Sequence, residues 1–199
     1  MKHIAHLSKD KKLKALIDAQ PARALEIRDK VYLRLCASIL SQQLSTKVAS
    51  VLYKRFLDLY GGKEPTAKKI LETPAEVFRS IGFSNAKASY VHNVCLFFIE
   101  NKITDKALYK MSNEEIIDLL TQIKGVGKWT VEMILMFTLG REDVFAFDDL
   151  GLKQSVIKLY KIKEADKKLL QKKMEIISLK WSPYRTYACR YLWDWKDGV

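Results

Sequence analysis

The sequence has few cysteines, with 3 in 199 residues. Cys36, Cys95 and Cys189 lie far apart, which excludes a disulfide framework, a four-cysteine iron–sulfur cluster and the usual zinc motifs. We expect all three to be buried apolar side chains in a protein of the reducing cytoplasm. The sequence also has no amino-terminal signal core and no apolar run of roughly 18 residues, so we expect neither a secretory leader nor a membrane span.

Acidic residues are also under-represented: the chain has 23 Asp and Glu against 35 Lys and Arg, which gives a net charge of +12. Such an excess predicts a polyanionic partner, most often nucleic acid, although a basic protein that is merely kept in solution by its charge is the alternative. Hydrophobic residues make up 48% of the chain, which is typical of a folded domain and excludes a disordered one.

Strand signals are missing as well, since no segment alternates with a period of two and no Asn-Gly or Asp-Gly pair stands between two such segments. The sequence therefore predicts an all-α protein. Helix-capping patterns begin at Thr73, where Pro74 would be the first helical residue, and at Ser112, which forms a capping box with Glu115. We expect helices at 7–19, 24–40, 46–60, 74–81, 84–99, 113–121, 129–139, 150–160, 164–180 and 183–195.

Two glycines one residue apart, Gly125 and Gly127, separate two of these expected helices, with Lys124 and Lys128 on either side. Gly125 suits a backbone conformation that other residues avoid, and Gly127 lets the turn approach another molecule closely. The free N–H groups at the start of the second helix, together with its dipole, favour binding of a phosphate. We therefore interpret the segment as a helix–hairpin–helix element that binds DNA without reading sequence; the alternative is a helical corner that needs glycine for packing.

Three further segments accompany this hairpin. They are Ile39-Leu-Ser-Gln-Gln-Leu-Ser45, Ile81-Gly-Phe-Ser-Asn-Ala-Lys-Ala88 and Trp181-Ser-Pro-Tyr-Arg-Thr-Tyr-Ala188. With the hairpin and the Asp pair at 148–149, they resemble the motifs of the helix–hairpin–helix (HhH-GPD) DNA glycosylase superfamily, and within it those of the 3-methyladenine DNA glycosylase II branch. The resemblance implies a two-lobed helical HhH-GPD fold in a single domain, 1–199. Its lobes would be roughly 31–140 and 1–30 plus 141–199, with the hairpin at about 113–139.

The resemblance makes Asp149 the catalytic carboxylate. Breaking an N-glycosidic bond leaves positive charge on the sugar, and an ionised carboxylate can stabilise that charge and orient or deprotonate water. The commonest role of an Asp before a helix is nevertheless N-capping. With two adjacent residues, Asp148 and Asp149, one can cap the helix while the other faces the site.

Bifunctional members of the superfamily carry a lysine that forms a Schiff base at the position of Trp129. Lys128 is one residue earlier and points about 100° away around the helix. We therefore expect a monofunctional enzyme that hydrolyses the base from the sugar without cutting the strand. We also expect neither the iron–sulfur loop of some relatives nor the extra amino-terminal β-domain of the larger alkyl-base members.

An alkylated purine flipped from the duplex would carry positive charge, which aromatic rings attract. The resemblance implies a base pocket formed by Trp129, Met133, Leu150 and Trp193. Larger members have aromatic residues at the positions of Met133 and Leu150. Ordinary packing is the alternative for Trp193. On the last helix, Tyr184, Ala188, Tyr191 and Trp195 share one stripe, which we expect to lie in the core.

The turn formed by Gln42, Gln43 and Leu44 is expected to contact DNA, with Gln43 filling the gap left by the flipped base. An ordinary polar turn is the alternative. Resemblance also implies a monovalent cation, sodium or potassium, held by hairpin carbonyls, while no cofactor is required. The expected DNA-binding residues of the hairpin are Lys124, Gly125, Gly127, Lys128 and Thr130, and the expected cation ligands are the carbonyls of Thr121, Ile123 and Val126.

The sequence thus predicts a monomeric cytoplasmic DNA glycosylase of base excision repair that acts on double-stranded DNA with alkylated bases. Two alternatives stay open: a glycosylase for uracil, hypoxanthine, ethenoadenine or mismatched bases, and a non-catalytic DNA-binding protein. His3, His6 and His92 lie outside the motifs, and we expect them to be structural or exposed.

Overall fold

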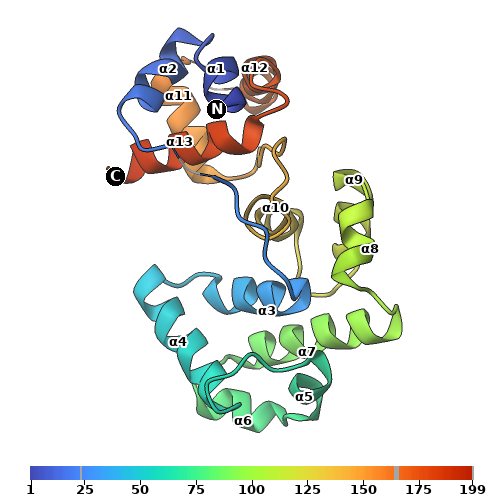
Figure 1. The fold of residues 1–199 in the computed structure, drawn as a ribbon. Helices are drawn as coiled ribbons and strands as arrows, with labels where there is room; N and C mark the ends of the chain where they lie inside the picture. The colour runs from blue at the N-terminus through green and yellow to red at the C-terminus, as the bar shows by residue number, and fades with distance from the viewer. Residues whose placement is uncertain (23, 164–165, 199) are drawn as a thin grey trace. The chain divides into compact units, whose positions relative to one another are not determined.

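The computed structural model describes residues 1–22, 24–163 and 166–198. Within these ranges the regular structure consists of thirteen α-helices, so the predicted all-α class is confirmed (Figure 1). The chain divides into two compact units, Met1–Glu26 with Leu135–Val199, and Ile27–Ile134. The expected lobes have the same discontinuous arrangement, with boundaries at 30 and 140 where the units have 26 and 134. No helix of the described residues is long and apolar enough to cross a membrane.

The continuous unit, Ile27–Ile134, is built around one long central helix. That helix, α7, packs against α3 and α5, as Figure 1 shows. Stacked and tilted rings of Phe56, Phe78 and Phe83 fill part of the core. The helices of this unit are α3 (Val31–Ser41), α4 (Thr46–Asp58), α5 (Ala67–Glu72), α6 (Ala75–Ser80), α7 (Asn85–Glu100), α8 (Asp105–Lys110), α9 (Asn113–Leu120) and the first part of α10 (Lys128–Phe137).

The discontinuous unit joins the two ends of the chain. Its core includes Trp181, whose indole N–H donates to Asp10 at 3.3 Å, and Tyr160, whose hydroxyl also hydrogen-bonds Asp10. The last helix packs on α11 and α2. The helices of this unit are the end of α10, α1 (Lys2–Leu7), α2 (Lys11–Asp18), α11 (Leu150–Tyr160), α12 (Lys167–Leu179) and α13 (Arg185–Asp197).

The bounds predicted for the first two helices were wrong. The segment expected as one helix over 7–19 ends one helix at Leu7 and begins another at Lys11, because Asp10 caps the second helix. The helix expected over 24–40 begins only at Val31. Its start is set by the Asp105 carboxylate, which accepts from the backbone N–H groups of Lys30 at 2.6 Å and Val31 at 3.1 Å.

The capping predictions had mixed outcomes. The capping box of Ser112 and Glu115 is confirmed. The cap expected at Thr73 is wrong, because Pro74 is the N-cap of α6 and the Thr73 hydroxyl donates to the Lys69 carbonyl at the end of α5.

Two later helices begin a few residues after their expected starts. The helix expected over 164–180 begins at Lys167, where Asp166 caps it, and residues 164–165 lie outside the described ranges. The helix expected over 183–195 begins at Arg185.

Candidate active site

Asp149 stands directly before α11 and is the N-cap of that helix. Its Oδ1 accepts the backbone N–H of Leu152 at 2.7 Å and the indole N–H of Trp193, from α13, at 3.0 Å. Of the two adjacent Asp residues, Asp149 is therefore the one that caps the helix. Two hydrogen bonds on one oxygen fix the orientation of this half-buried carboxylate.

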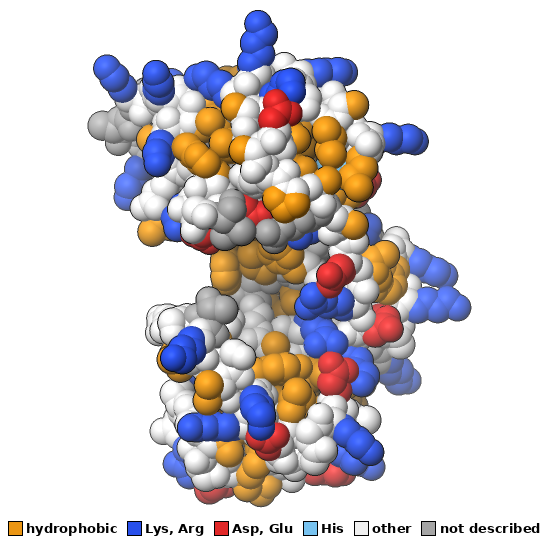
Figure 2. Space-filling model, turned by 60° about the vertical axis from the view of Figure 1, so that its left-hand side comes forward, with side chains coloured by type: hydrophobic (Ala, Val, Ile, Leu, Met, Phe, Trp, Pro, Cys, Tyr) orange, Lys and Arg blue, Asp and Glu red, His pale blue; other side chains and the backbone are white. Residues whose placement is uncertain are grey.

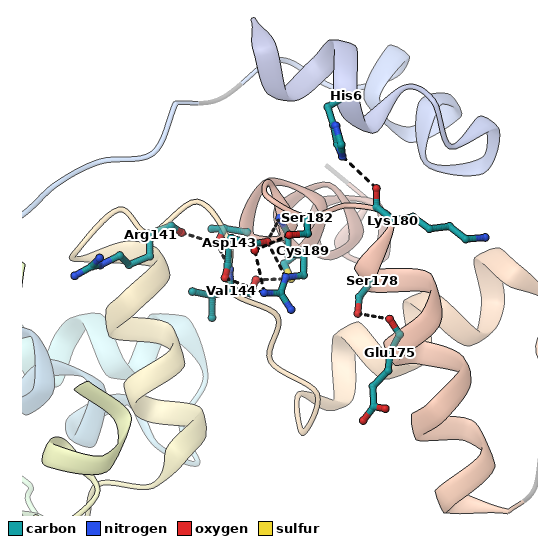
Figure 3. Close-up of polar contacts among 11 residues, drawn as sticks. His6, Arg141, Asp143, Val144, Glu175, Ser178, Lys180, Ser182 and Cys189 are labelled. Carbon is teal, nitrogen blue, oxygen red and sulfur yellow. Dashed lines mark hydrogen bonds and ion pairs between the residues drawn. The ribbon is translucent and has the colours of Figure 1, made fainter. Parts of the chain in front are cut away.

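The connection that leads from α10 to Asp149 is tied to the start of α13 (Figure 3). Arg185 holds the Asp143 carboxylate with two hydrogen bonds, Nε to Oδ1 at 2.7 Å and Nη2 to Oδ2 at 3.0 Å. Ser182 adds a third at 2.8 Å. Partial burial acts to raise the pKa of Asp143, but the hydrogen bonds from Arg185 and Ser182 outweigh it and hold this pKa below its usual value.

Thr186 continues this attachment one residue further along α13. Its hydroxyl donates to the carbonyl of Arg141 at 2.6 Å and accepts from the N–H of Val144 at 3.1 Å. Cys189 donates its thiol to the Val144 carbonyl at 3.7 Å. The Trp-Ser-Pro-Tyr-Arg-Thr-Tyr-Ala segment thus positions the backbone that precedes Asp149.

Phe137 and Gly151 lie close to the Asp149–Trp193 pair. Phe137, near the end of α10, lies 5.7 Å from Trp193 between ring centroids. A Cβ atom added to Gly151 would lie 3.2 Å from Asp149 Oδ1 and 3.5 Å from Trp193 Cδ1. Leu150, an expected pocket residue, is 66% exposed. Sequence reasoning missed Phe137 and Gly151, although a glycine in the first turn of a helix was a visible signal.

Asp148 has a different environment from Asp149. It is exposed and lines a hollow of about 410 Å³ with Lys153, Lys167 and Gln171. The structure therefore distinguishes the two carboxylates, one fixed by an indole and a helix terminus, the other open to solvent.

The hairpin between α9 and α10 has the geometry that its glycines predicted. Gly125 has a φ of +103°, and a Cβ there would lie 2.2 Å from Cγ of Tyr90. Gly127 has no atom within 4 Å of an added Cβ, so its surroundings are open. Backbone bonds from Ile123 to Leu120 at 3.2 Å and from Val126 to Ile123 at 2.9 Å tighten the turn. The hairpin therefore leaves open space beside Gly127 at the start of α10.

The expected DNA-binding residues of the hairpin differ in their exposure. Lys124 and Lys128 are exposed, and Lys128 Nζ lies 4.0 Å from Glu132 one turn later. Thr130 is only 2% exposed. Its side chain therefore faces inward, where its hydroxyl lies 3.5 Å from the Gln42 amide.

Trp129 and Met133, the two other expected pocket residues, lie one turn apart on α10 and belong to the unit 27–134. Trp129 is 41% exposed, and Met133 is half-buried.

The turn between α3 and α4 presents its three residues differently. Gln42 points inward, with its amide 3.5 Å from the Thr130 hydroxyl. Gln43 is exposed and has a φ of +60°, in the left-handed region. Leu44 is exposed and its N–H donates to the Ser41 carbonyl at 3.1 Å. Gln43 and Leu44 are therefore the two residues of this turn that are exposed to solvent.

The remaining expectations concern cysteine, histidine and charge. All three cysteines are buried thiols, as expected. His3 stacks on Tyr187 and His6 lies 3.2 Å from the Lys180 carbonyl (Figure 3), so both are structural. On the face drawn in Figure 2, Lys and Arg side chains project at many points and acidic side chains are fewer, which suits an anionic partner.

An all-helical fold, a glycine hairpin and a carboxylate fixed at a helix start define a protein of the helix–hairpin–helix class. The family model described as HhH-GPD superfamily base excision DNA repair protein matches residues 36–179. The chain belongs to this superfamily.

Individual relatives resemble nearly the whole chain. DNA-3-methyladenine glycosylase 1 of Schizosaccharomyces pombe is 35% identical over 195 residues, covering 96% of this chain and 84% of the relative. The crystal structure of a DNA-3-methyladenine glycosidase from Bacillus halodurans has a TM-score of 0.83 at 33% identity, covering 96% of this chain and 87% of that one. The S. pombe 3-methyladenine DNA glycosylase in complex with abasic DNA has a TM-score of 0.82 at 33% identity, covering 98% and 96%.

Proposed function

We propose that this protein is a monofunctional DNA glycosylase of base excision repair that hydrolyses alkylated bases of the 3-methyladenine type from double-stranded DNA. The observation that carries the proposal is the Asp149 carboxylate, fixed by Leu152 and Trp193 in a chain of the HhH-GPD superfamily. The names of the similar proteins support the substrate class.

The reaction follows from the chemistry of the carboxylate. As the bond between the sugar and the alkylated base breaks, positive charge develops on the sugar, and ionised Asp149 stabilises that charge. A water oxygen then bonds to the sugar carbon while Asp149 orients the water and accepts its proton. The base leaves with the bonding electrons, and an abasic site is the product.

Recognition of the base rests on the ring next to this carboxylate. Trp193 is half-buried and keeps its indole N–H on Asp149. An alkylated purine carries positive charge, and an indole face attracts such a cation better than any other side-chain ring. We propose that Trp193 contacts the damaged base while it fixes the carboxylate.

DNA binding is assigned to the hairpin and to the Gln turn of the unit 27–134. The first N–H groups of α10, with Lys124 and Lys128 nearby, would bind a backbone phosphate without reading the sequence. Gln43 would fill the gap left by the flipped base, where its amide can hydrogen-bond the orphaned base. We propose that the protein acts on DNA as a monomer.

A monovalent cation at the hairpin belongs to the same proposal. Carbonyl oxygens are neutral ligands that suit sodium or potassium, and those of Thr121, Ile123 and Val126 would hold the ion. The Ile123 carbonyl accepts one hydrogen bond, from Val126, and keeps a second lone pair. Replacing potassium and sodium with a bulky organic cation at constant ionic strength should weaken binding to duplex DNA; unchanged affinity would exclude the ion.

The direct test is release of bases from duplex DNA carrying radioactive methyl groups, with the products separated by chromatography. We expect free 3-methyladenine as the released base, and strands that break only after alkali treatment. A parallel set of duplexes with one uracil, hypoxanthine or ethenoadenine each should react more slowly. Release of none of these bases would leave a DNA-binding protein without glycosylase activity.

A further inference from the structure

Lys87, in the first turn of α7, reaches across to the end of α3. Its ammonium Nζ donates to the carbonyl of Leu40 at 2.8 Å and to that of Gln42 at 3.0 Å. These carbonyls lie 47 and 45 residues earlier in the chain. The last carbonyls of a helix lack partners inside it and lie at the negative end of its dipole, so a cation is suited to them.

The ammonium group of Lys87 contacts backbone carbonyls in a partly buried position, which is unusual for a lysine. Lys87 is half-buried, and burial lowers its pKa because it disfavours the charged form. Lys47 lines the same hollow beside Leu44 but is exposed. The two lysines therefore differ in what they do: one is held against backbone carbonyls, the other faces solvent.

Both carbonyls lie just before Gln43 in the chain. The Gln42 carbonyl belongs to the peptide bond that joins Gln42 to Gln43, so Lys87 fixes the plane of that peptide. Gln43 then adopts a φ of +60°, which is unfavourable for a residue with a side chain and persists only where its surroundings impose it. Gln42, on the inner side, contacts Thr130 at 3.5 Å.

We propose that Lys87 is a positioning residue, which holds Gln43 in the left-handed conformation that presents its side chain to the gap in the DNA. The inference rests on the proposed function, since gap filling by Gln43 is part of it. Lys87 is the lysine of the Gly-Phe-Ser-Asn-Ala-Lys-Ala segment. Its proposed role is separate from those of the Asp149 carboxylate and the glycine hairpin.

The test uses a duplex with 2-aminopurine opposite a tetrahydrofuran abasic analogue, so that binding can be followed without chemistry. Lys87→Met keeps the length and apolar stem of the side chain but removes the donors. Lys47→Met, the matched control, removes the same charge from the same hollow. Gln43→Ala removes the gap-filling side chain, and the Gln43→Ala, Lys87→Met double variant completes a cycle. Circular dichroism sets a temperature at which all variants are folded.

The expected results separate positioning from stability. Gln43→Ala and Lys87→Met should each reduce the fluorescence change at saturating protein, and the double variant should lose no more than the larger single loss. Excision from methylated DNA with enzyme in excess should slow by about tenfold or more in Lys87→Met, since a small misplacement of a contacting group is costly. Lys47→Met should keep the full fluorescence change.

Three results would overturn the inference, and they differ from failure of the proposed function. Lys87→Met could match Lys47→Met, or its loss could add fully to that of Gln43→Ala, which would make Lys87 a structural residue only. A normal signal from Gln43→Ala would remove the gap-filling role and the positioning role together. Failure of the glycosylase assignment would appear separately, as wild-type protein that changes the fluorescence but releases no base.

Discussion

The indole N–H of Trp193 donates to Oδ1 of Asp149 across 3.0 Å and thereby joins the last helix to the start of α11. The same oxygen accepts the N–H of Leu152. An aromatic ring that was expected only as a pocket wall is thus also a hydrogen-bond partner of the candidate catalytic group.

Trp193→Phe tests this dual role, because it keeps a ring beside Phe137 and removes the donor. We expect excision of methylated bases to slow by about tenfold, with a loss of stability of about 1 kcal/mol, the usual value of one hydrogen bond. Single-turnover rates and thermal melting measure the two effects. Trp195→Phe, whose ring contacts Lys158, is the control on the same helix and should excise at the normal rate. Equal rates for all three proteins would show that the indole bond has no part in catalysis.

The two hairpin glycines should respond oppositely to substitution. Gly125→Ala should destabilise the fold, because its φ is positive and the new methyl group would overlap Tyr90. Gly127→Val meets open space, so it should melt near wild type yet bind undamaged and damaged duplex about tenfold more weakly, or 1.4 kcal/mol. Binding of wild type should also weaken steeply with salt. Normal affinity of Gly127→Val for both duplexes would show that the hairpin is not the phosphate site.

The resemblance to the superfamily puts Trp129 where bifunctional members carry the Schiff-base lysine, so we expect no imine with the sugar. Borohydride added during the reaction should trap no covalent protein–DNA adduct, and strands should stay intact until alkali is added. Denaturing gels of end-labelled duplex detect both outcomes. An adduct that forms in wild type and persists in Lys128→Met would mean that another amine attacks the sugar.

Asp143 should make stability depend on pH. Its pKa in the folded protein lies below the ordinary value of 3.8, so it stabilises the fold above that value and the stabilisation disappears as the pH falls through the lower, folded pKa. Asp143→Asn should therefore have a free energy of unfolding about 1 to 2 kcal/mol below that of wild type at pH 7, and the difference should shrink below about pH 4. Asp197→Asn, an exposed control, should show no such trend. A gap between wild type and Asp143→Asn that is constant with pH would contradict this account.

The elements that could be predicted from the sequence are those whose determinants are local. Ser112 and Glu115 are three residues apart, and both halves of their capping box are visible in the sequence. The start of α3 was not visible, because its cap, Asp105, comes 75 residues after Lys30 in the chain.

The candidate site also has some features with local determinants and others that depend on residues distant in the chain. Gly125 and the position of Asp149 before a helix could be predicted from neighbouring residues. The bonds from Trp193 to Asp149 and from Arg185 to Asp143 span 44 and 42 residues. No local pattern indicates such pairs, since only folding brings the ends of α11 and α13 together.

The central claim is that Asp149 supplies charge to the reaction and does not merely cap α11. Asp149→Asn isolates that charge, because an Asn oxygen can still accept from Leu152 and Trp193 and caps a helix about as well. Asp148→Asn is the matched control, one residue away and exposed.

The measurement is single-turnover release of methylated bases by wild type, Asp149→Asn and Asp148→Asn, with melting and affinity for the abasic analogue measured alongside. We predict that Asp149→Asn melts and binds near wild type but excises at least about a hundredfold more slowly, as expected for loss of one preorganised electrostatic group. Asp148→Asn should lose far less. Near-normal excision by folded Asp149→Asn would leave this residue a helix cap, and an inactive Asp148→Asn would move the chemistry one residue upstream.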